Sequence, residues 1–328
     1  MSITVNQIAS QCGVSRTTVL RALNGGSVRK ETRDRILAVA EENHYRPNLL
    51  ARSLNHGRTM SLGVVTINVE NLFFVQSLNV IHKTADRKGF FTSIVVCDES
   101  REMEQQLIQG LADRQVDGIL ISPISKGREF EQFLLSLHIP VVCMGNQVAE
   151  SITTVRVDEQ KAAEDAFRLI ASKGYQRIIF VCPPLELEKK ENIFSHKQRL
   201  KGVQKASAGY PEIDTEIIGN GSYLEKAAEL IEKQKGKTAF LCSGDTYALN
   251  LLRWAQQNGK SVPGDFGLMG FDDISILDYV TPKLTTVSTN LEGVASSAVN
   301  ELIEQIDSES YTPKTILLNY KILDRETL

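Results

Sequence analysis

The sequence of 328 residues lacks any run of about 18 apolar residues, the length that a membrane-spanning helix requires. It also lacks the apolar N-terminal segment that a secretory signal carries. Cysteine is scarce, odd in number and without metal-binding or redox spacing, at Cys12, Cys97, Cys143, Cys182 and Cys242. We therefore expect a soluble, cytoplasmic protein whose thiols are reduced and mostly buried.

Sequence signatures of catalysis and cofactor binding are missing as well. There is no GxxxxGKS/T phosphate loop, no GxGxxG after a strand, no GxSxG, no HExxH and no CxxC. The five histidines are scattered, at His44, His56, His82, His138 and His196. We expect no metal, no cofactor and no enzymatic activity. Because a fold does not fix a function, an enzyme acting on a carbohydrate is kept as the less favoured alternative.

Charge is distributed unevenly along the chain. Residues 1–60 contain nine Lys and Arg against four Asp and Glu, whereas the other 268 residues contain 28 against 36. The net charge is therefore +5 in the first segment and −8 in the remainder, although the whole chain carries only −3. A basic segment at one end of an acidic chain is typical of a protein whose end meets phosphates.

Residues 4–23 read as two short helices joined by a tight turn. Thr4 can cap the first helix with Gln7 as its capping-box partner, and the apolar stripe of this helix ends near Cys12. Gly13 follows where the turn needs a positive φ, and Ser15 can cap the second helix. This is the pattern of a helix-turn-helix DNA-binding unit.

The second helix has an apolar face and a polar face. Helical spacing puts Val19, Ala22 and Leu23 on the first, and Arg16, Thr17, Leu20 and Arg21 on the second. Arginine pairs bidentately with guanine in the major groove, and threonine contacts a phosphate or a thymine methyl group. The residues better placed for phosphates are Ser15, Thr18 and Asn24. The alternative is the solvated face of a small helical domain.

After Arg58, short apolar strands alternate with helical patterns. The first series of strands is SLGVVTI, FFTSIVVC, VDGILISP and PVVCMG, and the second is TTVRVD, RIIFVC, TEIIG, TAFLCS and FGLMGF. Continuous apolar strands that alternate with helices predict parallel, doubly wound sheets. The expected fold class is α/β, with an all-α helix-turn-helix head followed by two doubly wound subdomains.

The segments IASQCGVSRTTVLRALN and YRPNLLARSL resemble the head of the lactose-repressor family of bacterial transcription regulators. The resemblance extends along the whole chain and implies that Arg16, Thr17 and Arg21 read bases in the major groove. It also implies that residues 48–55 form a hinge helix only on DNA, where Leu54 of each protomer wedges into a minor-groove step. Further expected DNA contacts are Thr4, Arg29, Tyr45 and Asn48.

The same resemblance implies a core like that of periplasmic binding proteins, in which the chain crosses between two subdomains three times. The expected domains are the helix-turn-helix domain at 1–47, the hinge helix and linker at 48–60, an N-terminal effector subdomain at 61–160 with about 291–318, and a C-terminal one at 161–290 with about 319–328. Two such subdomains place the carboxyl ends of their strands around a ligand crevice.

Polar and aromatic residues near the predicted strand ends are candidates for binding an effector. The resemblance assigns Phe73, Phe74, Arg199 and Asp245 to the pocket, and strand ends add Asp272, Ser122, Asn146 and Ser243. Three alternatives stay open. Arg199 can be an ordinary surface arginine, Asp245 is equally suited to cap a helix, and one phenylalanine can belong to the core.

The predicted pocket departs from the family pattern. Gly244 stands where the family usually has asparagine, and Thr289 stands where many sugar binders have glutamine, so the effectors of well-known relatives do not transfer. His196, Lys197 and Arg199 form a cationic cluster in the sequence that suits a carboxylate or phosphate. We therefore favour a sugar acid or sugar phosphate over a neutral sugar.

We expect a bacterial repressor of carbohydrate-utilisation genes that binds a palindromic operator in double-stranded DNA as a homodimer. A small-molecule effector would close the cleft, separate the hinge segments and lower operator affinity. The alternative is a corepressor-dependent regulator that binds a nucleobase or another metabolite, and a protein co-regulator is a further option. The chain ends without a heptad repeat, so a dimer is expected instead of a tetramer.

Overall fold

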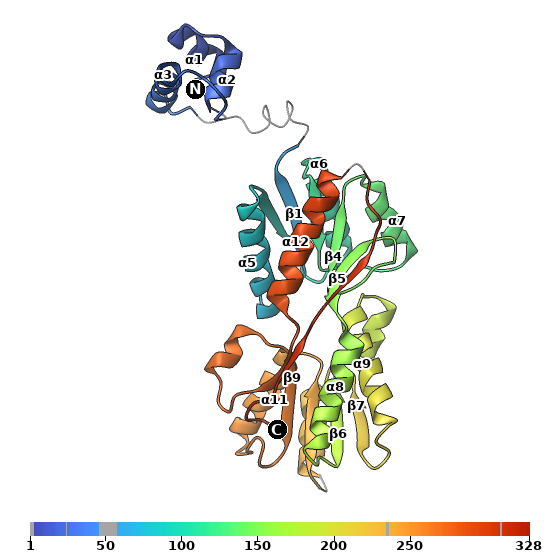
Figure 1. The fold of residues 1–328 in the computed structure, drawn as a ribbon. Coiled ribbons are helices and arrows are strands. Elements are labelled where there is room, and N and C mark those ends of the chain that lie inside the picture. The colour runs from blue at the N-terminus through green and yellow to red at the C-terminus, as the bar shows by residue number, and fades with distance from the viewer. Residues whose placement is uncertain (1–2, 24, 46–57, 234–235, 309) are drawn as a thin grey trace. The chain divides into compact units, whose positions relative to one another are not determined.

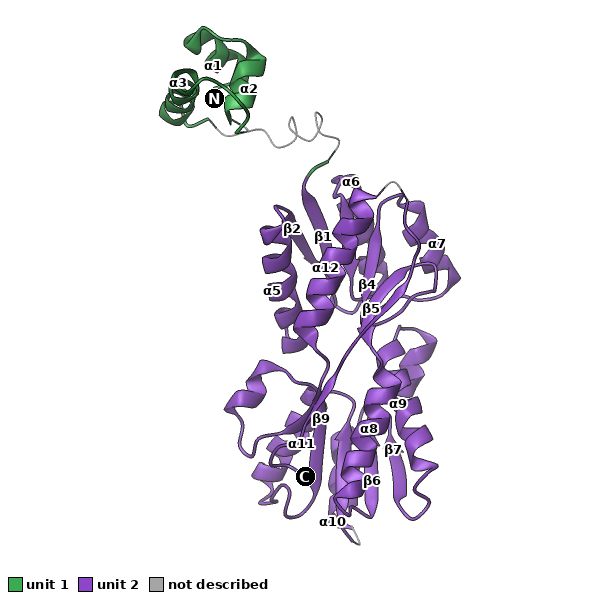
Figure 2. Ribbon diagram, in the orientation of Figure 1, with its two compact units in different colours: residues 1–59 green, residues 60–328 purple. Residues whose placement is uncertain are grey.

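The computed structural model describes residues 3–23, 25–45, 58–233, 236–308 and 310–328. The chain divides into two compact units, Met1–Thr59 and Met60–Leu328, which are described separately (Figure 2). The predictions for Asn24, Asn48, Leu54 and the hinge helix at 48–55 lie outside the described residues. Within the described ranges, no helix is both long enough and apolar enough to cross a membrane.

The N-terminal unit contains three helices around one small core. They are α1 (Val5–Cys12), α2 (Arg16–Leu23) and α3 (Lys30–Glu42). Thr4 caps α1 in a capping box with Gln7, and Gly13 ends that helix with a φ of 62°, both as predicted. The buried side chains of this core are Ile8, Ala9, Cys12, Val19, Ala22, Ile36 and Ala40. Packing of α2 against this core leaves its polar face outward.

The C-terminal unit contains two six-stranded sheets, and every pairing in the first is parallel. The first sheet has the order β11-β5-β4-β3-β1-β2. Its strands are β1 (Ser61–Thr66), β2 (Phe91–Val96), β3 (Gly118–Ile121), β4 (Val141–Met144), β5 (Thr153–Val157) and β11 (Thr315–Leu318). Its helices are α5 (Leu72–Arg87), α6 (Arg101–Asp113), α7 (Arg128–Ser136) and α12 (Leu291–Asp307). Figure 1 shows α5 and α12 side by side on this sheet.

The second sheet has the order β12-β10-β9-β8-β6-β7, and only its edge strand β12 pairs antiparallel. Its strands are β6 (Arg177–Val181), β7 (Asp214–Ile218), β8 (Thr238–Cys242), β9 (Gly267–Asp272), β10 (Thr285–Ser288) and β12 (Lys321–Leu323). Its helices are α8 (Glu159–Ser172), α9 (Phe194–Ser207), α10 (Tyr223–Glu232) and α11 (Asp245–Gln257), with 3₁₀ turns at Leu185–Lys189 and Ser275–Tyr279.

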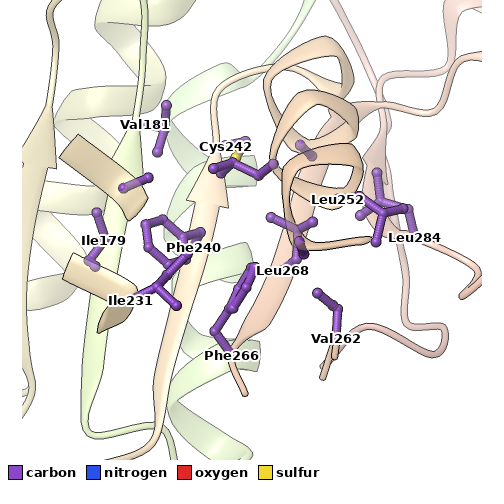
Figure 3. Packing of buried hydrophobic residues seen from close by; sticks show 14 of the residues in the cluster. Ile179, Val181, Ile231, Phe240, Cys242, Leu252, Val262, Phe266, Leu268 and Leu284 are labelled. Atoms are coloured by element: carbon purple, nitrogen blue, oxygen red, sulfur yellow. The ribbon is translucent and has the colours of Figure 1, made fainter. Parts of the chain in front are cut away.

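The chain passes between the two sheets three times. It leaves the first sheet after β5, returns through α12 after β10, and leaves again between β11 and β12 (Figure 1). Apolar side chains pack on both faces of each sheet, and Figure 3 shows Phe240, Phe266 and Leu268 within one such cluster. The predicted α/β fold class, with a helical head and two doubly wound subdomains, is confirmed.

Candidate functional site

The polar face of α2 is the exposed surface of the N-terminal unit that sequence analysis assigns to DNA. Arg16, Thr17 and Arg21 are exposed, whereas Val19 and Ala22 on the other side of the helix are buried. Among the described residues, no acidic side chain forms an ion pair with either arginine. Both guanidinium groups are therefore available to a ligand that offers acceptor oxygens or nitrogens.

The other predicted DNA-binding residues of this unit have local roles that the structure shows. The Ser15 hydroxyl accepts the backbone N–H of Thr18 at 3.1 Å and lies 2.8 Å from the Thr18 hydroxyl, so both side chains order the start of α2. Arg29 is exposed at the start of α3, and Tyr45 packs partly against the core. Their contacts with DNA, like that of Thr4, stay predictions.

A cavity of about 770 Å³ lies within the C-terminal unit, where residues that follow strands of both sheets converge. Six of the eight predicted effector residues line it, namely Phe73, Phe74, Ser122, Asn146, Arg199 and Asp272, whereas Asp245 and Ser243 do not. The lining also includes Gly244, Thr289 and His196, which sequence analysis singled out. Residues from both sheets thus face one cavity of the size that small ligands occupy.

Arg199 is the centre of a buried ionic network. Only 4% of this residue is exposed, so it is not an ordinary surface arginine. Its Nε donates to Glu159 at 2.7 Å, one Nη donates to the carbonyl of Ser243 at 2.7 Å, and the other donates to Asp272 at 3.2 Å. The guanidinium carbon also lies 3.7 Å from the ring centroid of Phe271.

The pKa values of this network follow from burial and pairing. Burial alone lowers the pKa of Arg199, but Glu159 and Asp272 outweigh it and raise the pKa above its ordinary value. Burial raises the pKa of Asp272, and the charge of Arg199 opposes that rise. Arg199 is therefore a permanent cation whose charge is already matched by carboxylates of the protein.

Asp245 does not line the cavity, which corrects its assignment to effector contact. It is the first residue of α11 and is 1% exposed. One carboxylate oxygen accepts from the Thr286 hydroxyl at 2.6 Å, and the other accepts from the backbone N–H of Ile274 at 3.0 Å. Asp245 thus ties α11 to β10 and to the turn after β9, because both of its oxygens face buried donors.

The predicted cationic cluster is also wrong. Burial and the charge of Arg199 lower the pKa of His196 to about 3, so this histidine is neutral at physiological pH. Its Nδ1 lies 2.7 Å from the hydroxyl of the buried Ser243. Lys197 forms an ion pair with Glu188, and Arg199 is neutralised as described above. None of the three offers an unpaired positive charge to a ligand.

Asn146 and Asn192 join the two walls of the cavity. Asn146, which follows β4, donates to the carbonyls of Pro123 and Asn192 and accepts from the backbone N–H of Ser195. Both amide N–H donors are thus used by the protein, and the amide oxygen, which accepts one hydrogen bond, is the part of this side chain that could still bind an effector. Asn192, which precedes α9, donates to the carbonyls of Ser125 and Gln147. We call this pair the asparagine clamp.

Aromatic rings supply the apolar part of the lining. Phe73 and Phe74 stand edge to face with their centroids 5.4 Å apart, and Phe73 also packs against the core of the second sheet. Both line the cavity, so a purely structural role for either ring is not supported. Tyr247 adds a third ring, edge to face with Tyr223 at 5.1 Å. Such surfaces suit the apolar faces of a ring-shaped ligand.

The polar lining residues that sequence analysis did not single out include Arg156, Glu159 and Asn192. Arg156 and Glu159 lie at the passage from β5 to α8, in the segment RVDEQ. A charged pair at the end of an apolar strand was the available signal for them. Asn192 lies in a loop without periodicity and gave no signal. Within the described ranges, no group of His, Cys, Asp and Glu side chains is arranged to hold a metal ion.

Comparison with known proteins agrees with this geometry. Residues 4–48 match the family described as bacterial regulatory proteins, lacI family, and residues 167–328 match the periplasmic binding protein-like domain. The chain is 28% identical over 335 residues to catabolite control protein A of Priestia megaterium, with 100% of this chain and 99% of that protein aligned.

Solved structures show the same fold. The Lac repressor dimer bound to operator and the anti-inducer ONPF has a TM-score of 0.85 at 22% identity, covering 100% of this chain and 99% of that one. The complex of the transcriptional regulator CelR with cellobiose has a TM-score of 0.70 at 21% identity, covering 99% of both chains. The chain thus carries a segment at residues 4–48 that matches the lacI family of bacterial regulatory proteins and a periplasmic binding protein-like domain at residues 167–328, and it is similar from end to end to catabolite control protein A and, in fold, to the Lac repressor.

Proposed function

We propose that this regulator represses carbohydrate-utilisation genes and is released from a palindromic operator by a small hydroxylated ligand. The observation that carries the proposal is the presence in one chain of an exposed arginine face on α2 and a ligand-sized cavity in the C-terminal unit. Arg16, Thr17 and Arg21 would read base edges, and Ser15, Thr18 and Arg29 would contact phosphates. An enzyme is not proposed, because the buried carboxylates of the lining, Glu159 and Asp272, are paired with Arg199.

The cavity is suited to a carbohydrate because it combines aromatic walls with a few fixed polar groups. The CelR relative is described as bound to cellobiose, and the Lac repressor relative as bound to operator together with an anti-inducer. Ligand binding between residues of both sheets would favour one arrangement of the subdomains over another. Operator affinity changes only if that arrangement binds DNA differently. A corepressor would bind in the same cavity but would raise operator affinity instead of lowering it.

Self-association is supported by exposed apolar residues on the edge strand β2. Phe91 is 71% exposed, Ile94 44% and Val96 38%, although an edge strand normally carries polar groups that prevent pairing. A second copy of the chain would cover this surface and bring two heads to the two halves of a palindrome. The Lac repressor relative is described as a dimer.

Selection of binding sites from random double-stranded DNA tests the proposal. The full chain should enrich one palindrome with half-sites about one helical turn apart, and its affinity for that site should exceed its affinity for scrambled DNA by about 10³-fold or more. The matched double variant Arg16→Ala/Arg21→Ala should lose the enrichment. Recovery of unrelated sequences by the wild-type protein would refute sequence-specific regulation.

A further inference from the structure

One cation of the cavity lining has no counter-ion. Arg156, the penultimate residue of β5, lines the cavity, and no described carboxylate forms an ion pair with it. One Nη donates to the carbonyl of Val157 at 3.1 Å. The Nε is buried and has no hydrogen-bond partner among the described residues. Five donor hydrogens of this guanidinium are thus met by a single acceptor of the protein.

The surroundings of Arg156 hold it near the cavity without neutralising it. The guanidinium carbon lies 5.2 Å from the ring centroid of Phe194, at the start of α9. Burial lowers the pKa of Arg156, and the charges of Glu159 and Asp158 oppose this. Glu159 already pairs with Arg199 at 2.7 Å, and Asp158 caps α8 by accepting from the Lys161 N–H at 3.0 Å. An anion in the cavity would fill the donor positions left open.

Other polar groups of the cavity offer acceptors suited to hydroxyl groups. Asp272 uses Oδ1 for Arg199, and no described donor binds its Oδ2. Thr289 is only 5% exposed, and its hydroxyl has no partner among the described residues. Gly244 leaves space beside this carboxylate, since a Cβ there would lie 3.6 Å from Asp272 Oδ2. An unsatisfied buried hydroxyl and a carboxylate oxygen without a described donor, both in the lining of one cavity, indicate that a hydroxylated ligand would bind there.

The remaining acidic residues of the lining oppose an anion only weakly. Glu70 and Glu99 are exposed, and Glu191 is partly exposed. Solvent and salt screen such charges far more than they screen a buried contact. The half-buried Arg156 is therefore a cation that lacks an ion-pair partner among the described residues and that an anionic group of a ligand could contact.

We propose that the cavity takes a polyhydroxylated ligand with one carboxylate or phosphate group, and that Arg156 binds this anion. The inference rests on the proposed function only in treating the cavity as the effector site. Arg156 takes the place of the His196, Lys197 and Arg199 cluster as the source of positive charge. Its planar fork matches both oxygens of a carboxylate or two oxygens of a phosphate. Asp272 and Thr289 bind hydroxyl groups of the same ligand.

Calorimetric titration of the full chain tests the ligand class. The probes are glucose, galactose, fructose and ribose, each compared with its phosphates and with its uronic or aldonic acids, together with glucosamine and galactosamine. At least one anionic sugar should bind about 10- to 100-fold more tightly than its neutral parent, as expected for a charge-assisted contact. The amino sugars should bind no better than the neutral sugars.

Variants of Arg156 test the assigned residue. Arg156→Gln should lower affinity for the anionic ligand about 10- to 100-fold and leave affinity for its neutral parent within about twofold. Arg156→Lys should keep part of the affinity because it retains the charge but not the fork. Arg253→Gln, on the exposed surface of α11 outside the lining, is the matched control and should bind as wild type does.

Several results would overturn this inference. They are a neutral or amino sugar as the tightest ligand, failure of every anionic probe to bind, or equal affinity of Arg156→Gln and wild type for an anionic ligand. Operator binding by Arg156→Gln, measured without ligand, separates failure of this inference from failure of the proposed function. If Arg156→Gln still binds the selected palindrome, sequence-specific DNA binding stands whatever the ligand result. If an anionic sugar binds through Arg156 but never changes operator binding, the inference stands and the regulatory proposal fails.

Discussion

At the scale of single residues, the arginines of the N-terminal unit divide into two kinds. Arg16→Ala or Arg21→Ala should each cost about 1 to 3 kcal/mol of operator binding and relax the preference at one base position, because each removes a bidentate base contact. Arg29→Ala should weaken binding evenly across sequences and reduce the salt dependence. Fluorescence anisotropy with the selected palindrome and its single-base variants measures all three. Equal losses on operator and random DNA would remove the base-reading assignment.

His196 gives the C-terminal unit a defined sensitivity to acid. Its pKa in the folded protein is about 3, against 6.5 as the ordinary value, so unfolding takes up a proton at mildly acidic pH. The stability contributed by neutral His196 is present above about pH 6.5 and is lost as the pH falls from 6.5 towards 3. Calorimetric melting from pH 7.5 to pH 4 should show a shallower decline of Tm for His196→Asn than for wild type.

The exposed His138 provides the control for this measurement. His138→Asn should keep the acid dependence of the wild-type protein, because that side chain is exposed and Asn tolerates its φ of 54°. A wild-type decline of Tm in His196→Asn would show that other groups cause the acid sensitivity.

Asp272 connects ligand binding to the buried network. Asp272→Asn should leave operator binding intact and abolish the response to ligand, because it alters the oxygen offered to hydroxyl groups. Arg199→Ala should instead destabilise the protein by about 3 to 5 kcal/mol, since Glu159 and Asp272 would stay buried without their partner. Ligand titration of operator binding and urea unfolding separate the two effects. A normal response of Asp272→Asn would show that the pocket is misplaced.

The residues that line the cavity could be predicted from the sequence better than the ion pairs that these residues form. Arg199 was predicted from the resemblance and Asp272 from its strand end, and both residues line one cavity. The cationic cluster around Arg199 was wrong because its neutralising partners, Glu159 and Glu188, lie 40 and 9 positions away along the chain. Burial likewise sets the neutral state of His196. The spacing of residues along one helix predicts neither the ion pairs that neutralise Arg199 and Lys197 nor the burial of His196.

At the scale of elements, the asparagine clamp joins loops that follow strands of different sheets. Asn192 is buried and bonds to Ser125 and Gln147, and the carboxylate of Glu104 on α6 fixes the same loop by accepting N–H groups of Ile124 and Ser125 at 2.9 Å each. This arrangement holds one side of the cavity in place.

Asn192→Ala should lower the free energy of unfolding by about 1 to 3 kcal/mol, because it leaves buried carbonyls without donors. It should also weaken ligand binding by loosening the cavity walls. Urea unfolding and calorimetric titration measure the two effects. Asn258→Ala, at the exposed C-terminus of α11, is the control and should change neither quantity appreciably. Unchanged stability and ligand affinity in Asn192→Ala would remove the clamp from the mechanism.

The helices and strands themselves were largely predictable. Continuous apolar runs became the parallel strands β1, β3, β6 and β8, and the capping box at Thr4 was visible in four residues. The side on which β11 and β12 join the sheets was not predictable from periodicity, because short strands of similar composition fit either sheet. Only the family resemblance supplied that crossing.

At the scale of the whole molecule, the exposed apolar edge of β2 predicts an obligatory dimer on DNA. Phe91→Glu should produce monomers in analytical ultracentrifugation and weaken operator binding about 10²-fold or more, because two linked heads gain affinity from simultaneous contact. Met103→Glu on α6 is the control, since that side chain is also exposed but lies off the edge strand. A dimer that persists in Phe91→Glu would move the interface to another surface.

The central claim is that the cavity of the C-terminal unit controls DNA binding by the N-terminal unit. Operator affinity of the full chain, measured with and without the anionic sugar that calorimetry identifies, tests it most directly, with Asp272→Asn in parallel. We predict that the ligand lowers wild-type operator affinity about tenfold or more and leaves Asp272→Asn unaffected. Unchanged operator affinity in wild-type protein whose cavity is saturated with ligand would contradict the claim.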